Sequence, residues 1–145
     1  MAVLKVTVKE ELVLNGKDMG NENFLSISGI ESAEHRIVSV GTAEQSVLLF
    51  NASTISAGTV IDDTVKHLRL TNLDSTNKIT LRIEDSATPG QYYVDLEAGE
   101  TFILGNSVMY ADNTNNAGET LVAIDAIYAT ADTAISDLEM FIATT

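Results

Sequence analysis

The sequence predicts an all-β protein, built as an antiparallel β-sandwich of the jelly-roll or Greek-key type. Three observations predict this class. Apolar and polar residues alternate along many short segments, which is the period-two pattern of half-buried strands. Glycine, asparagine and aspartate separate these segments at short intervals, as turn residues do. No segment carries the sustained apolar periodicity of an amphipathic helix.

The alternation predicts about eleven short strands. In chain order they are Leu4 to Val8, Leu12 to Leu14, Phe24 to Ile30, His35 to Val40, Ser46 to Phe50, Val65 to Thr71, Ile79 to Glu84, Tyr92 to Leu96, Thr101 to Leu104, Leu121 to Ala129 and Ile135 to Ala143. Asn15-Gly16 and Ala98-Gly99 predict turns. Only Ser32 to His35 and Ala131 to Ile135 are candidates for brief helical turns.

The central strands indicate a register. We expect the loop 72–77 to join a hairpin in which Leu70 lies opposite Ile79. Leu68 then lies opposite Leu81, and apolar side chains meet on one face.

The next connection is Thr88-Pro89-Gly90-Gln91, which has the sequence of a type II turn, with proline where φ is fixed and glycine where φ is positive. Pairing back from this turn sets Ile83 against Tyr92, Leu81 against Val94 and Ile79 against Leu96. Ala98-Gly99 then turns the chain into a strand that offers Phe102 and Leu104 to the same core.

The last two strands are not expected to pair with each other. A direct hairpin between them would place Asp125 opposite Glu139, and like charges destabilise a ladder. A jelly-roll or Greek-key arrangement puts these strands in different sheets and removes the conflict. A partly closed barrel is the alternative.

Three short elements of the central region also carry a resemblance. They are the Asn-Leu-Asp turn at Asn72 to Asp74, the Leu-Arg strand at Leu81 to Ile83, and the Leu-x-x-Gly-Glu corner at Leu96 to Glu100. In these elements, and more loosely in its C-terminal strands, the chain resembles small virion structural proteins of tailed bacteriophages. The resemblance implies a two-sheet fold and a capsid decoration or cement role, in a class whose members commonly occupy threefold capsid positions.

Length and composition predict one domain over residues 1–145, since this length is close to the commonest domain size. The chain is 45% apolar and only 6% aromatic, which fits a core of Val, Ile, Leu and Ala. It has no cysteine, so disulfides and thiolate metal sites are excluded. We see no signal-peptide core and no apolar run of about 18 residues, and expect a soluble chain made in a host cytoplasm.

The charge argues against two classes of partner. With 21 acidic and 8 basic residues, the formal net charge is −13. Nucleic acids and anionic membranes attract clusters of Lys and Arg, and this chain has none, so we expect it to bind neither. An acidic surface suits either a basic partner or simple solubility.

The candidate chemical groups are few, and we expect no catalytic residue, no cofactor and no metal ion. Of the two histidines, His35 and His67, alternation places His67 on a polar face beside Arg82, in a structural role. Asp62-Asp63 and the loop 112–119 hold oxygen ligands, but solvated loops explain both. No nucleophile elbow or glycine-rich phosphate loop occurs, so we do not expect an enzyme.

Two apolar features predict an interaction surface instead. The N-terminal strand carries Val3, Leu4, Val6 and Val8, and either docks on the chain's own core or adds to a neighbouring subunit. On the last strand, Phe141 points away from the other apolar residues, with Ile127 as its companion on the preceding strand. Phe141 either contacts another subunit or packs within its own chain.

Together with these features, the resemblance implies a phage virion structural protein, a cement protein on the capsid exterior that binds the major capsid protein and itself as a homotrimer. A tail, fibre or adaptor component would share the sandwich and differ in its partner. A carbohydrate-binding module would need an exposed aromatic platform, made from four phenylalanines and from Tyr92, Tyr93, Tyr110 and Tyr128.

Overall fold

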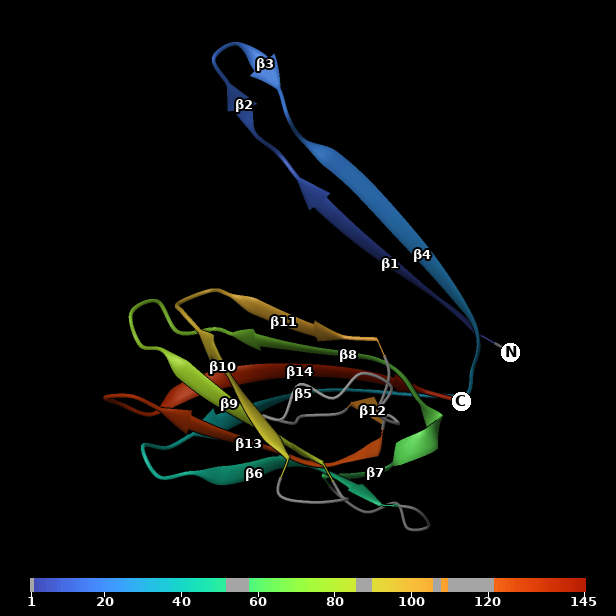
Figure 1. Cartoon of the computed structure of the whole chain (residues 1–145), viewed down its shortest axis with the longest axis vertical. Helices are drawn as coiled ribbons and strands as arrows, with labels where there is room; N and C mark the ends of the chain where they lie inside the picture. The colour runs from blue at the N-terminus through green and yellow to red at the C-terminus, as the bar shows by residue number, and fades with distance from the viewer. Residues whose placement is uncertain (1, 52–57, 86–89, 106–107, 110–121) are drawn as a thin grey trace.

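The computed structural model describes every residue except 1, 52–57, 86–89, 106–107 and 110–121. The described residues form a β-sandwich, from which a long β-hairpin projects (Figure 1). They contain strands, one 3-10 turn and no α-helix. The all-β prediction is therefore confirmed.

The sandwich consists of two sheets. The six-stranded sheet has the order β10 (Gln91–Leu96), β9 (Ile79–Asp85), β13 (Val122–Ala131), β6 (Gln45–Asn51) and β7 (Thr59–Ile61), and β12 (Val108–Met109) also pairs with β13. The four-stranded sheet has the order β11 (Thr101–Leu104), β8 (Val65–Asn72), β14 (Ser136–Thr144) and β5 (Ser32–Val40). The 3-10 turn η1 (Asp62–Thr64) leads from β7 into β8. All pairs are antiparallel except β6 with β7, which are parallel.

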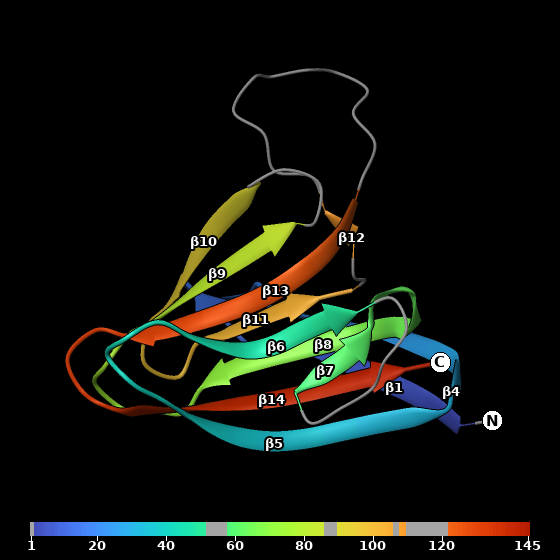
Figure 2. The ribbon, with the colours of Figure 1, turned by 90° about the horizontal axis from the view of Figure 1, so that it is seen from below.

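The strand order is that of a jelly roll. Eight strands wrap the core, and in chain order the first pairs with the last, β5 with β14, and the second with the seventh, β6 with β13. The third pairs with the sixth, β8 with β11, and the fourth with the fifth, β9 with β10. These nested pairs belong alternately to the two sheets, as in a double Greek key (Figure 2). The jelly-roll prediction is confirmed.

The core lies between the two sheets and is built almost entirely from aliphatic side chains. Its fully buried members include Leu48, Leu68, Leu70, Ile79, Leu81, Ile83, Ile124, Ile127, Leu138, Met140 and Ile142. Phe102 and Leu104 of β11 pack against this cluster, as predicted. Every member of the cluster follows residue 39 in the sequence, so the projecting hairpin contributes nothing to it.

One of the two predicted central registers is confirmed and the other is wrong. β9 and β10 pair with Ile83 opposite Tyr92 and Leu81 opposite Val94, as expected. The turn at 88–91 lies largely outside the described residues. β8 and β9 form no hairpin: β8 pairs with β11 and β14, while β9 pairs with β10 and β13. Both strands bury an apolar face in the same core. The alternation of apolar and polar residues is the same whether two strands pair within one sheet or face each other across the core.

The other local expectations divide in the same way. The last two strands lie in different sheets, as the charge argument predicted. Ser32 to His35 is not a helical turn, because these residues begin β5. The segment from Ala131 to Ile135 is not helical either: Ala131 ends β13 and the following residues form a bend. The eleven predicted strands are present, and the short strands β3, β7 and β12 were not expected.

The projecting hairpin spans residues 2–30 and is called the arm below. β1 (Ala2–Glu10) pairs with β4 (Asn21–Ile30), and the short strands β2 (Val13–Leu14) and β3 (Lys17–Asp18) close its tip. Asn15 and Gly16 connect β2 to β3 with φ values of 52° and 76°. Positive φ at both central residues matches a type I′ turn, for which Asn-Gly is the preferred sequence. The predicted turn at Asn15-Gly16 is confirmed.

Candidate interaction surface

The arm has one apolar face and one polar face. The register places Leu4 opposite Ile27 and Val6 opposite Leu25, and directly opposed residues of a ladder share a face. The apolar arm face therefore consists of Leu4, Val6, Val8, Leu25 and Ile27. The opposite face carries Val3, Lys5, Thr7, Lys9, Phe24 and Ser26.

The apolar arm face is largely open to solvent toward the tip. Leu25 is 58% exposed and Val8 is 41% exposed, whereas Leu4 and Ile27, nearer the sandwich, are half-buried. Within the described residues, β1 and β4 pair only with each other. Because an isolated two-stranded hairpin is marginally stable in water, such a surface is typical of an element that packs against a partner.

The predicted interface residues of the N-terminal strand fall on both faces of the arm. Leu4, Val6 and Val8 belong to the apolar arm face, but Val3 lies on the other face and is 55% exposed. The strand forms no ladder with the sheets of the sandwich, so simple docking as an extra core strand is not what the structure shows.

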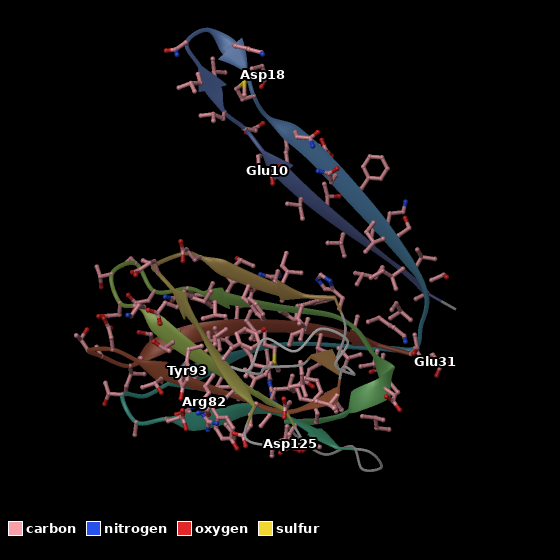
Figure 3. All side chains as sticks on the ribbon, in the orientation of Figure 1. Glu10, Asp18, Glu31, Arg82, Tyr93 and Asp125 are labelled. Carbon is pink, nitrogen blue, oxygen red and sulfur yellow. The ribbon has the colours of Figure 1, made fainter. Side chains whose placement is uncertain are left out.

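The junction between arm and sandwich is anchored. Ile30 is buried, and the backbone N–H of Glu31 donates a hydrogen bond to the carbonyl of Thr144 at 2.9 Å. Gly29 has a φ of 80°, a conformation that a residue with a Cβ adopts only with strain. Figure 3 shows Glu31 at this junction and Glu10 and Asp18 toward the far end of the arm. The anchoring fixes the direction in which the arm leaves.

The arm extends over the outer face of the four-stranded sheet and diverges from it (Figures 1 and 2). Three large apolar side chains lie on this outer face: Ile37 of β5, Ile103 of β11 and Phe141 of β14. Ile37 is 57% exposed and Ile103 is 45% exposed, while Phe141 is half-buried. The prediction that Phe141 points away from the core is confirmed.

Ile127 does not accompany Phe141. It belongs to the other sheet and is fully buried in the core. Register shifts interrupt β13 between Ile124 and Ala126 on one side and between Ile127 and Tyr128 on the other. A bulge inserts an extra residue and reverses the alternation, so Ile127 points inward together with Ile124. The assignment of Ile127 to an outward-facing surface was wrong.

A polar network occupies the middle of the same outer face. Nη1 of Arg69 donates to Oε2 of Glu139 at 2.7 Å, and Nε2 of His35 lies 2.6 Å from Oε1 of the same carboxylate. Arg69 also donates to the hydroxyl of Thr71. The hydrogen bond from Arg69, followed by that from His35, lowers the pKa of Glu139. The network satisfies both oxygens of the carboxylate on this face.

His67 lies on the same outer face as Arg69, the polar face that alternation predicted, and it is buried there. It lies on β8 opposite Ala143, and its ring meets the ring of Phe141 edge-on at a centroid distance of 6.1 Å. Burial, and then the charge of Arg69, lowers the pKa of His67 and favours its neutral form. Because β8 and β9 belong to different sheets, Arg82 is not its neighbour.

Arg82 instead organises the outer side of the six-stranded sheet. Its guanidinium donates two hydrogen bonds to Glu44, at 2.8 and 2.9 Å, and also pairs with Glu84. It lies 4.0 Å from the centre of the Tyr128 ring. The hydrogen bond from Arg82 lowers the pKa of Glu44. This cluster ties the connection before β6 to β9 and β13, which is a structural role.

The remaining candidate groups show no shared site. Asp62 to Thr64 form the turn η1, and the loop 112–119 lies outside the described residues. In the part of the chain that the structure describes, no group of three or more His, Cys, Asp or Glu side chains is placed to hold a metal ion. No helix in that part is both long enough and apolar enough to cross a membrane.

Comparisons with known proteins give no match: no protein-family model, curated protein sequence or solved structure is significantly similar to this chain.

Proposed function

We propose that this protein is a structural, non-enzymatic component of a phage particle, a decoration or cement protein on the capsid exterior. It would bind the major capsid protein and other copies of itself, in the assembled virion, after synthesis in the host cytoplasm. The observation that carries the assembly role is the arm, which projects from the jelly roll and presents an exposed apolar face. The phage context comes from the resemblance of the motifs between Asn72 and Glu100.

The arm supports attachment by two physical routes. Its apolar face offers buried area, which is the main source of favourable free energy in association. Its extended backbone suits strand pairing, a common way of joining β proteins. When several copies attach to one lattice, even modest affinity for each copy becomes strong through avidity.

The charge distribution supports the same assignment. The arm holds three of the eight basic residues, Lys5, Lys9 and Lys17, together with four acidic ones. Its net charge is therefore −1, and the remaining −12 belongs to residues 31–145. The members of the apolar arm face carry no charge, so this face can be buried against a partner without desolvating a charged group, while the acidic remainder of the chain stays in solvent or meets basic groups.

We propose a homotrimer as the assembled state, because the phage proteins that the chain resembles commonly occupy threefold capsid positions. Light scattering coupled to size exclusion measures this state directly. A monomer that persists at tens of micromolar would contradict the trimer. Weak oligomers assemble at such protein concentrations, so a monomer there would show that the copies do not associate.

The alternative functions differ in partner. A tail, fibre or adaptor component would use the same arm on another part of the particle. A carbohydrate-binding module needs adjacent exposed aromatic rings. In the described residues, the two most exposed aromatic side chains are Phe24 on the arm and Tyr93 on β10, which belong to different elements, and Tyr110 lies outside the described residues. This separation favours the structural role.

The test mixes purified protein with particles that lack it. We expect saturation at a fixed ratio to the major capsid protein and greater resistance of the particles to heat. Val6→Lys places a charge on the apolar arm face and should weaken binding by about tenfold or more, since burying one valine contributes on the order of 1.5 kcal/mol.

The matched control is Thr7→Lys, which adds the same charge at the adjacent position on the polar arm face. It should bind nearly as well as the unmodified protein. Equal loss in both variants would show that charge, not the apolar face, decides binding. Binding to isolated tails instead of capsid shells would favour the tail component, and binding to neither would reject the virion role.

A further inference from the structure

We propose that the apolar arm face of one copy packs on the outer face of the four-stranded sheet of a second copy. This inference deepens the proposed function, because it specifies the surface through which the copies assemble. The occupant of the outer face is thus the arm of a neighbouring copy of the same chain.

The strands of the arm and of the sheet match in length. β1 and β4 contain nine and ten residues, and β5 and β14 contain nine each. At about 3.3 Å per residue, both sets of strands are about 30 Å long, and the apolar residues from Leu4 to Val8 cover about half of that length. Two β layers pack face to face when each presents a row of apolar side chains, and the arm would add a third layer to the sandwich.

The outer face of the sheet has the composition of a surface that can be covered. Ile37 and Ile103 are exposed at its two edge strands, and Phe141 lies between them on β14. The charged groups in its centre, Arg69 and Glu139, already pair with each other. Covering this face therefore buries apolar area without leaving either of these two charges unpaired.

The geometry of the junction favours a second copy over the chain's own sheet. Ile30, Gly29 and the hydrogen bond from Glu31 hold the arm at an angle to its own sheet. The arm diverges toward its tip (Figure 1), and its apolar residues become more exposed in the same direction. The half of the arm that carries Val8 and Leu25 is thus available only to another molecule.

Charge favours the same pairing. Two copies that met through residues 31–145 alone would bring together units of net charge −12, which repel each other. An arm of net charge −1 can approach a neighbouring sandwich with little repulsion. Arm-to-sheet contact is a head-to-tail interface, and such interfaces form closed rings when the rotation between copies closes, as it does in a trimer.

Crosslinking tests the proposal, because the native chain contains no cysteine. One chain carries Leu25→Cys on the apolar arm face, and a second chain carries Ile37→Cys or Ile103→Cys on the sheet. The two full-length chains are mixed and treated with a short bis-maleimide. A product of the two different chains can form only between molecules, so folding of the arm onto its own sheet gives no signal.

Phe24→Cys is the matched control. Phe24 neighbours Leu25 but lies on the opposite arm face, and at 80% exposure it is more accessible than Leu25. Random collision would therefore favour crosslinks at position 24. Docking through the apolar face should favour position 25 by about tenfold or more, because it raises the effective concentration of that thiol near the sheet.

Three results would overturn the proposal. One is equal crosslinking from positions 24 and 25. Another is a trimer by light scattering that gives no mixed product at either sheet position. The third result uses a single chain that carries both an arm cysteine and a sheet cysteine. The proposal fails if the protein is a monomer and only this chain forms a crosslink, between its own two cysteines. If particle binding survives in any of these cases, the proposed virion function stands and only the arm-to-sheet contact fails.

Discussion

Asn72 lies at the end of β8, where the chain leaves the four-stranded sheet for the six-stranded one, and its side chain is completely buried. Its Nδ2 group donates to the carbonyls of Asn77 at 2.8 Å, Leu96 at 3.0 Å and Glu97 at 3.1 Å. Its Oδ1 accepts from the backbone N–H of Asp74 at 3.0 Å. One side chain therefore joins the connection after β8 to the connection after β10.

Replacing Asn72 by alanine should destabilise the fold strongly. The substitution leaves these carbonyls without their donor, and each buried unsatisfied polar group costs about 1–3 kcal/mol. Of the three hydrogen bonds to carbonyls, only the one to Leu96 is fully buried, so we expect the free energy of unfolding to fall by about 2–4 kcal/mol. Urea unfolding followed by circular dichroism measures the change. Leu73→Ala, at a neighbouring position that is 47% exposed, should change it by less than about 1 kcal/mol.

The substitution Asn72→Asp adds a test of sign. The side chain keeps its size, but a carboxylate would face the three carbonyl oxygens, so burial and repulsion should raise its pKa in the folded state. A raised folded-state pKa means that the folded form gains stability, relative to the unfolded form, as pH falls through that value. The variant should therefore recover stability relative to the unmodified protein as the pH falls from neutral toward the ordinary pKa of aspartate. A pH-independent difference, or an Asn72→Ala variant as stable as the unmodified protein, would refute this account of the site.

Two further predictions concern the core and the adjacent turn. Ile127→Ala should lower the free energy of unfolding by about 2–5 kcal/mol in a thermal or urea melt, because Ile127 is fully buried. A change near zero would show that the side chain is exposed, as the sequence predicted. Asp74→Asn should lose stability mainly at neutral pH. Backbone N–H groups of Asn77 and Thr76 hold the pKa of Asp74 below its usual value, so the stabilisation is present above that usual value and lost in acid. Parallel pH-stability curves for variant and parent would contradict this.

The strand pairing that the sequence predicted correctly joins two strands that are neighbours in the chain. The register of β9 with β10 followed from apolar alternation on both sides of one short connection. The hairpin between β8 and β9 failed for a physical reason: Leu70 and Ile79 both need burial, and the core satisfies them from opposite sheets. In the structure the hydrogen bonds of Asn72 and Asp74 hold the connection between β8 and β9, which crosses from one sheet to the other. Alternation along one sequence carries no information on whether such a connection is a hairpin or a crossover.

The misplacement of Ile127 has a different origin. Strict alternation from Ile124 puts Ile127 outside, and the bulge in β13 reverses the pattern. The bulge leaves no clear mark in the sequence, because Val122 to Ile124 and Ala126 to Ala129 are both runs of consecutive apolar residues. Alternation alone therefore does not locate the inserted residue that the bulge accommodates.

The arm shows what alternation can and cannot determine about assembly. β1 and β4 alternate as regularly as the core strands, and both were predicted as strands. Alternation indicates that one face of a strand is apolar and favours burial. It does not indicate whether the same chain or another molecule packs against that face. In β9 the inward side chains Leu81 and Ile83 are fully buried within the chain, whereas Leu25 on the arm stays 58% exposed. The same pattern is satisfied in one case and left open in the other, and our proposal assigns the missing cover of the arm to another molecule. The proposed assembly function rests on this open face more directly than on any single residue type.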